Sequence, residues 1–144
     1  MTSRVELDIN EGQAQVAELF TDPRNSPAWM DDLERVEPIS GELGQPGSMY
    51  RLVPKKGRLV FVATVVSRLL PVELQVRLDN PHVSMMATDT FLKLSEGKTR
   101  LVSEEVFIFK GLFGAVAGFF ARGAIGRAHR RHMESFKRFA ESQA

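Results

Sequence analysis

The amino-acid sequence predicts an α+β fold: a curved antiparallel sheet of about seven strands, two short helices and one long C-terminal helix. Three observations support this prediction. Six apolar, alternating segments between residues 34 and 109 are separated by short clusters of turn-forming residues. Two prolines interrupt a short helical region near the N-terminus, and about thirty residues of helical pattern end the chain.

The length and composition are those of one globular domain. The chain has 144 residues, of which 43% are hydrophobic, and we expect a single domain over 1–144. Nineteen basic against 18 acidic residues leave a net charge of +1, which argues against a nucleic-acid-binding protein. The absence of cysteine excludes disulfides and thiolate chemistry. The longest apolar run, residues 111–126, is too short for a membrane span, and we predict a soluble cytoplasmic protein.

The N-terminal region predicts a strand followed by two short helices. The segment VELDI, Val5–Ile9, alternates apolar and polar residues as a half-buried strand does. Asn10 is the predicted N-cap of the first helix. Pro23 ends that helix at the preceding residue and can open a second helix, which reaches about Met30.

Six further strands are predicted at about 34–41, 48–54, 58–68, 72–79, 84–95 and 99–109. Their short connections predict that neighbouring strands pair antiparallel in a meander. The segment VELQVRLD has the clearest alternation, with Leu74 and Val76 on its apolar face. Six consecutive strands need a cover on one face of the sheet, and the long helix is the element available to supply it.

The last strand predicts a carboxyl group that faces the interior. In RLVSEEVFIF successive side chains point to opposite faces, so Glu104 and Glu105 cannot share one face. We assign inward the set that carries the aromatic residues: Leu101, Ser103, Glu105, Phe107 and Phe109. Burial raises the pKa of a glutamate unless a cation pairs with it, which makes Glu105 the candidate general acid/base or polar anchor for a ligand. A structural ion pair with an inward arginine, or a bulge that turns Glu105 outward, are the alternatives.

Other polar residues are predicted around the same interior. Thr88 and Thr90 share the face of Leu92, and we expect that face to be the inner one. Tyr50, the single tyrosine, follows the glycine that opens its strand. Trp29, the single tryptophan, is either a core anchor or an amphipathic residue with its ring inward and its N–H toward a polar partner.

The C-terminal helix, predicted from Leu112 to about Glu141, has an apolar row in its second half and glycines in its first half. The row consists of Ile125, His129, Met133 and Phe136. The glycines cost about 0.5–1 kcal/mol each relative to alanine, so they need a reason. They leave volume for a ligand, allow close backbone packing at Gly114 and Gly118, or form a gate apolar enough to meet a membrane surface or a partner.

No metal site or cofactor is predicted. His129 and His132 stand one helical turn apart and could reach one metal ion, but zinc needs at least three protein ligands and no third is evident. We expect these histidines to be partly buried and to touch the sheet. The basic residues of ARGAIGRAHRRH predict a solvated helix face, with a contact to RNA or to lipid headgroups as the alternative. The sequence has no phosphate-binding loop or nucleophile triad.

Motifs along nearly the whole chain resemble the START-like superfamily, which has the helix-grip fold, and its polyketide cyclase/dehydrase-like branch in particular. The residues that carry the resemblance are VAELFTDPRNSPAWMDDLERVE, GQPGSMYRL, EGKTRLVSEEVF and the closing RRHMESFKRFAE. Each motif alone is weak, whereas their order and spacing together are fairly specific.

The resemblance implies a cavity between the concave sheet and the long helix that holds a small hydrophobic or amphipathic molecule. The segment that contains Trp29 would help to close its mouth. The expected lining residues are Trp29, Leu74, Val76, Thr88, Thr90, Leu92, Ser103, Phe107, Val116 and Phe120. A non-catalytic carrier or sensor is the leading hypothesis.

The alternatives are a polyketide cyclase, aromatase or dehydratase that uses Glu105 and Tyr50 for proton transfer, and a co-chaperone-like protein–protein module. Apolar residues on the outer face of the last strand, such as Val102, Val106 and Ile108, also suggest a homodimer.

Overall fold

The computed structural model describes residues 1–56 and 59–143, and the side chains of residues 113 and 115 are outside that description. The predicted strand start at residue 58 therefore lies outside the described residues.

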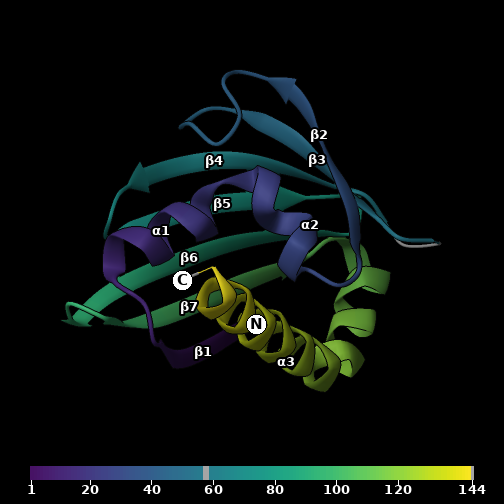
Figure 1. Cartoon of the computed structure of the whole chain (residues 1–144). Helices are drawn as coiled ribbons and strands as arrows, with labels where there is room; N and C mark the ends of the chain where they lie inside the picture. The colour runs from purple at the N-terminus through teal and green to yellow at the C-terminus, as the bar shows by residue number, and fades with distance from the viewer. Residues whose placement is uncertain (57–58, 144) are drawn as a thin grey trace.

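Seven strands form one curved antiparallel sheet in the order β1-β7-β6-β5-β4-β3-β2 (Figure 1). The consecutive strands β2 to β7 form the predicted meander, and the N-terminal strand pairs with β7 at the edge. The strands are β1 (Thr2–Ile9), β2 (Leu33–Ser40), β3 (Met49–Pro54), β4 (Phe61–Leu69), β5 (Glu73–Asp79), β6 (Val83–Ser95) and β7 (Lys98–Phe109).

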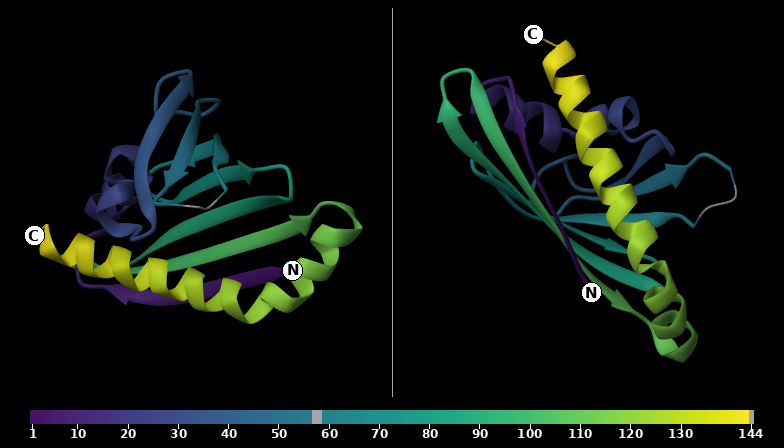
Figure 2. Two further views of the ribbon diagram at one scale, coloured as in Figure 1. Left: turned by 90° about the vertical axis from the view of Figure 1, so that its right-hand side faces the viewer. Right: turned by 90° about the horizontal axis from the view of Figure 1, so that it is seen from below.

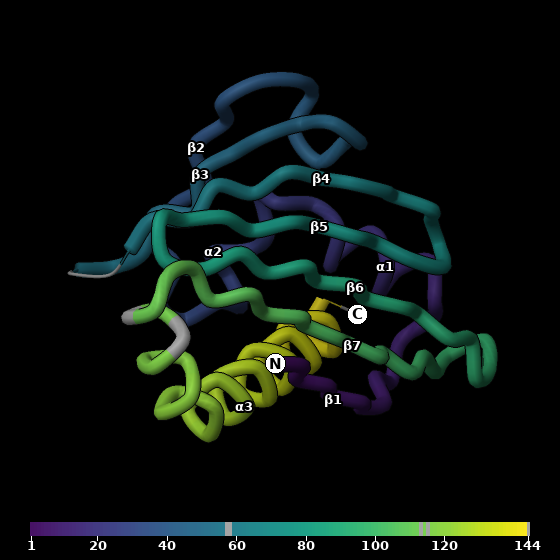
Figure 3. Tube along the Cα trace, turned by 180° about the vertical axis from the view of Figure 1, so that it is seen from behind, coloured from purple at the N-terminus to yellow at the C-terminus, as the bar shows by residue number. Residues whose placement is uncertain are grey.

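The helices lie on the concave side of the sheet. They are α1 (Gln13–Thr21), the 3₁₀ helix η1 (Pro23–Asn25), α2 (Ser26–Trp29) and α3 (Gly111–Ser142). Figure 2 shows α3 running along β1, with its first turns inclined to the rest of the helix. Seen from behind, α1, α2 and the second half of α3 lie beyond the sheet, so that the convex face is turned to the viewer (Figure 3).

The start of α1 differs from the prediction. The residue that caps α1 is Gly12, and the helix begins at Gln13. The backbone N–H of Asn10 instead donates a 2.8 Å hydrogen bond to Glu141 Oε2 near the end of α3. The predicted N-cap was therefore wrong, since the cap lies two residues later, at Gly12. The predicted end of α1 before Pro23 is confirmed.

An aromatic core cluster of Phe20, Trp29, Phe91 and Phe136 joins α1, α2, β6 and α3. The ring centroid of Phe20 lies 5.3 Å from Trp29, 5.5 Å from Phe91 and 4.8 Å from Phe136. All four side chains are buried. Trp29 is thus a core anchor, which was one of the two alternatives, and its Nε1–H has no hydrogen-bond partner among the described residues.

Burial on the concave face falls from one end of the sheet to the other. Along the inward face of β7, Thr99, Leu101 and Ser103 are buried, whereas Glu105, Phe107 and Phe109 are half-buried. Leu78 on β5 and Ala87 on β6 are also half-buried. The packed core therefore fills one end of the concave face, and more side chains are half-buried toward the start of α3, although Met85 opposite Phe107 is buried, as are Ala63 and Tyr50 in the same row. The enclosed cavity stays a prediction.

Two glycines of α3 are explained by close packing, which was one of the three alternatives. A Cβ atom on Gly118 would overlap the ring of Phe109, and one on Gly114 would lie 3.3 Å from the carbonyl oxygen of His82. These residues therefore bring the first half of α3 against the end of β7 and the β5–β6 turn. Gly126 differs, because a Cβ atom there would meet nothing within 4 Å.

Alanine at these two positions should have opposite effects. We expect Gly126→Ala to raise the free energy of unfolding by about 0.5–1 kcal/mol, the usual gain in helix propensity. Gly118→Ala should lower it by about 1–3 kcal/mol, because the Phe109 ring must move. Equilibrium urea unfolding measures both changes. Equal stabilisation by the two variants would contradict the close packing at Gly118.

Candidate ligand-binding site

Glu105 lies on the concave face of β7, in the orientation predicted from strand parity. Its cross-strand neighbours are Ala87 on β6 and Ser3 on β1. The Glu105 side chain keeps 17% of its surface exposed. It therefore stands at the boundary between the packed core and the half-buried side chains toward the start of α3.

Asp89 on β6 supplies a second carboxyl group on the same face. It is opposite Ser103 in the β6–β7 register, two pairs along from the Ala87–Glu105 pair and therefore on the same face. Asp89 is buried and hydrogen bonds with Ser103, while its Oδ1 atom has no partner among the described residues. Burial raises the pKa of the Asp89 carboxyl to about 7, and the Ser103 hydrogen bond offsets part of that effect.

His129 of α3 lies between two serines and connects the helix to the sheet. Its Nε2 atom is 2.8 Å from Ser103 Oγ, and its Nδ1 atom is 2.8 Å from Ser3 Oγ. Burial lowers the pKa of the imidazole to about 4, with smaller contributions from His132 and Arg130. A neutral ring has one donor and one acceptor nitrogen, so one serine donates to His129 and the other accepts. Hydrogen bonds therefore link Ser103 to Ser3 through His129, and Asp89 is the cross-strand neighbour of Ser103.

Glu105 completes this buried polar network, which consists of Ser3, Asp89, Ser103, Glu105 and His129. Its Oε1 atom lies 3.6 Å from His129 Nδ1. Burial raises the pKa of Glu105 to about 8, and the nearby Asp89 carboxyl adds to the increase. Because the imidazole is neutral, it does not offset the charge of either carboxylate. Near neutral pH the two carboxyl groups can therefore hold and exchange protons, which is the chemistry of a general acid or base.

Tyr50 is buried on the concave face but lies away from Glu105. It pairs with Ala63 on β4, and β4, β5 and β6 separate its strand from β7. Burial raises the pKa of the phenol to about 12. The structure thus does not make Tyr50 a neighbour of Glu105 on the sheet.

The structure brings only part of the predicted lining together. Leu74, Val76, Ser103 and Phe107 face the concave side with Glu105, as predicted. The orientation predicted for β6 was wrong, because its buried residues are Met85, Asp89 and Phe91. Thr88, Thr90 and Leu92 therefore lie on the convex face, and Val116 and Phe120 of α3 are exposed to solvent.

Three residues of the network, Ser3, Asp89 and His129, were not predicted to belong to the site. Leu92 and Leu94 suggested the wrong parity for β6, since both leucines are exposed in the β6–β7 hairpin. The large aromatic Phe91 carried the correct signal, and it would have placed Asp89 inward. For His129 the apolar row on α3 predicted contact with the sheet, and this contact is confirmed.

Two surface hollows lie elsewhere. One of about 390 Å³ is lined by Leu7, Asp8, Arg130, Glu134, Lys137 and Arg138, between β1 and α3. Another of about 380 Å³ is lined by Glu6, Leu7, Asp8 and Arg100. Five of the six residues that line the first hollow and three of the four that line the second are charged, which does not suit a mainly apolar ligand. We therefore place the candidate site on the concave face beside the buried polar network.

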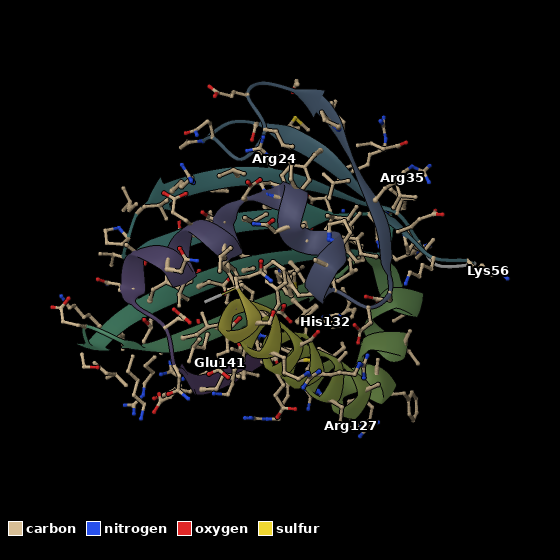
Figure 4. The ribbon with its side chains drawn as sticks, viewed as in Figure 1. Arg24, Arg35, Lys56, Arg127, His132 and Glu141 are labelled. Atoms are coloured by element: carbon tan, nitrogen blue, oxygen red, sulfur yellow. The ribbon has the colours of Figure 1, made fainter. Side chains whose placement is uncertain are left out.

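The part of the chain that the structure describes contains neither a group of metal ligands nor a membrane-spanning helix. Within 1–56 and 59–143, no three histidine, aspartate or glutamate residues gather in a way that could hold a metal ion. His132 Nε2 lies 3.2 Å from Asp32 Oδ1, and Figure 4 shows His132 on α3. Among the same residues, no helix combines the length and the apolar character that a membrane span requires.

Comparison with solved structures shows the fold. A START superfamily protein from Mycobacterium smegmatis has a TM-score of 0.83 at 14% identity, covering 99% of both chains. The Zhui aromatase/cyclase from Streptomyces sp. R1128 has a TM-score of 0.80 at 17% identity, covering 98% of this chain and 93% of that one. Norcoclaurine synthase from Thalictrum flavum, in complex with dopamine and hydroxybenzaldehyde, has a TM-score of 0.71 at 11% identity, covering 100% of this chain and 88% of that one.

The sequence itself identifies the family. A search of curated proteins found no significant match. Residues 2–141 match the family model described as polyketide cyclase/dehydrase and lipid transport. This match covers almost the entire chain and agrees with the curved sheet and long C-terminal helix. The chain therefore belongs to the polyketide cyclase/dehydrase and lipid transport family of START-like proteins.

Proposed function

We propose that this protein binds a small amphipathic molecule on the concave face of its sheet, as a carrier or sensor. The observation that carries the proposal is the position of Glu105, an incompletely buried carboxyl group on an otherwise apolar surface. The apolar part of the ligand would contact Ala87 and Phe107, and its polar end would hydrogen bond with Glu105. The half-buried state of these side chains supports an accessible surface there.

The charges around Glu105 favour particular polar ends. Glu105 and Asp89 are both acidic, and the imidazole of His129 is neutral at neutral pH because its pKa is about 4. A hydroxyl or an amine can donate a hydrogen bond to these carboxyl groups. A carboxylate would add a third acidic group to a poorly solvated site, which is unfavourable.

The first experiment is native mass spectrometry of gently purified protein, followed by denaturing extraction of any released molecule. A stoichiometric amphipathic adduct is the expected result. The location of the site is then tested with adjacent substitutions on opposite faces of β6. Ala87→Phe fills the concave face, whereas Thr88→Phe adds the same side chain on the convex face.

We expect Ala87→Phe to weaken binding of the neutral fluorescent probe N-phenyl-1-naphthylamine by about tenfold or more, because the added ring occupies the proposed surface. Thr88→Phe should leave the affinity unchanged. Fluorescence titration measures both, and circular dichroism checks that each variant is folded. Equal affinities for the two variants would contradict a site on the concave face, and Phe107→Ala provides a second test if Ala87→Phe does not fold.

A second candidate function is proton transfer to a bound polyketide-like substrate, with Glu105 as the general acid or base. It is supported by the pKa of about 8 for Glu105, which is close to the range in which a catalytic acid or base operates. Conversion of the released molecule by the wild type but not by Glu105→Gln would favour this function. Intact binding with no conversion by the wild type would exclude it for that molecule.

A further inference from the structure

The first half of α3 presents an exposed apolar ridge, formed by Leu112, Val116, Phe119 and Phe120. Their spacing places them on one helical face. Leu112 is 86% exposed, Phe119 is 63% exposed and Phe120 is 80% exposed. Large aromatic side chains are seldom left this open, and several adjacent ones are typical of an interaction surface.

The close packing of α3 explains why this ridge faces outward. Gly114 and Gly118 are buried on the side of the helix that meets the β5–β6 turn and Phe109. Because glycines occupy the contact, the aromatic residues of this segment point away from the sheet. The ridge residues thus contribute little to the core of the described structure.

The residues around the ridge have a marked excess of positive charge. From Val106 to Met133 the sequence contains five lysines and arginines and no aspartate or glutamate. The Arg122 guanidinium carbon lies 5.4 Å from the ring centroid of Phe119. Arg127 continues the same helical face and projects from the outer side of α3 in Figure 4. On the adjacent β5–β6 hairpin, Asp79 already pairs with Arg77 at 2.9 Å.

We propose that the apolar ridge of α3 docks this protein onto the surface of a bilayer that contains anionic phospholipid. In this arrangement the helix lies in the interfacial plane, with Phe119 and Phe120 among the upper acyl chains and Arg122 and Arg127 at the phosphate groups. An exposed apolar face flanked by arginines has the composition of such interfacial helices. No transmembrane segment is needed, because the rest of the domain stays outside the bilayer.

The charge also argues against two other occupants. In a symmetric contact between two copies, the cations around one ridge would face those around the other, which is unfavourable. A nucleic acid would use the arginines but would leave the aromatic side chains largely in water. The proposal concerns the outer surface of α3 and does not depend on the ligand proposed for the concave face.

The test is co-sedimentation of the full chain with large unilamellar vesicles. Vesicles of phosphatidylcholine mixed with phosphatidylglycerol should bind the protein, vesicles of phosphatidylcholine alone should bind it weakly, and added salt should reduce binding. Phe119→Ser with Phe120→Ser should weaken binding by about tenfold or more. Arg122→Gln with Arg127→Gln should weaken it by about fivefold per arginine.

A matched control uses another exposed apolar pair, Leu69→Ser with Val72→Ser at the β4–β5 turn, which should bind like the wild type. Circular dichroism and thermal unfolding verify that all variants are folded. The proposal is overturned if the wild type does not co-sediment with anionic vesicles. It is also overturned if the variant with Phe119→Ser and Phe120→Ser binds these vesicles as well as the wild type does. The proposal is also overturned if light scattering shows that the wild type is a dimer and that only the ridge variant is a monomer. The ridge would then be a self-association surface.

Discussion

Phe136→Ala is expected to lower the free energy of unfolding by about 3–5 kcal/mol, the usual range for removal of a fully buried aromatic side chain. The Phe136 side chain is fully buried, and its ring centroid lies 4.8 Å from Phe20 and 5.2 Å from Trp29. Its removal would leave a cavity between α3 and the short helices. Equilibrium urea unfolding, followed by circular dichroism, measures the change.

The matched control is Phe119→Ala, which removes the same side chain from the exposed face of the same helix. We expect a change within about 0.5 kcal/mol, as for surface substitutions in general. A loss of stability at Phe119 as large as that at Phe136 would mean that the ridge packs against the domain. That result would contradict the exposed ridge.

Glu105→Gln is expected to stabilise the protein progressively as the pH rises from 5 to 9. Because the folded-state pKa of Glu105 is raised from 4.5 to about 8, the folded state holds this proton more tightly than the unfolded state does. The resulting stability is present below about pH 4.5 and is lost as the pH rises through 8. Glutamine does not titrate, so its advantage over glutamate should grow by on the order of 3 kcal/mol across this range.

Two other network residues set the pH window for this measurement. The pKa of Asp89 is raised from 3.8 to about 7, so its contribution also decreases as the pH rises. The pKa of His129 is lowered from 6.5 to about 4, so its contribution is present above pH 6.5 and is lost as the pH falls through 4. Above pH 6.5 the contribution of His129 to the free energy of unfolding no longer changes with pH. The pH dependence caused by Glu105 is therefore measured there without a contribution from His129.

Thermal and urea unfolding of the wild type and the variant between pH 5 and 9 give the required comparison. Glu104→Gln is the control, because Glu104 is the adjacent residue on the convex face and has a 44% exposed side chain. The free energy of unfolding of this variant should change with pH in the same way as that of the wild type. Parallel curves for Glu105→Gln and the wild type would show that Glu105 is well solvated or paired in the folded state.

Much of the fold could be predicted because periodicity reports local geometry. The alternation in β5 and β7 gave the correct inward faces, and the proline after Asp22 gave the end of α1. The same argument failed for β6, where Leu92 and Leu94 are exposed beyond the packed part of the sheet. A strand pattern reports which face is apolar, and a long hairpin can have apolar residues on its solvent side.

The order of elements, the meander and the inward orientation of Glu105 could be predicted from local patterns, because these features depend on residues close together in the chain. Tertiary structure alone decided the buried polar network. His129 is 126 residues from Ser3 and 26 from Ser103, and only the docking of α3 beside β1 and β7 brings their side chains to 2.8 Å. The acidity of Glu105 and Asp89 depends on that same packing, because burial and the charges nearby, rather than residue type, move a pKa so far from its ordinary value.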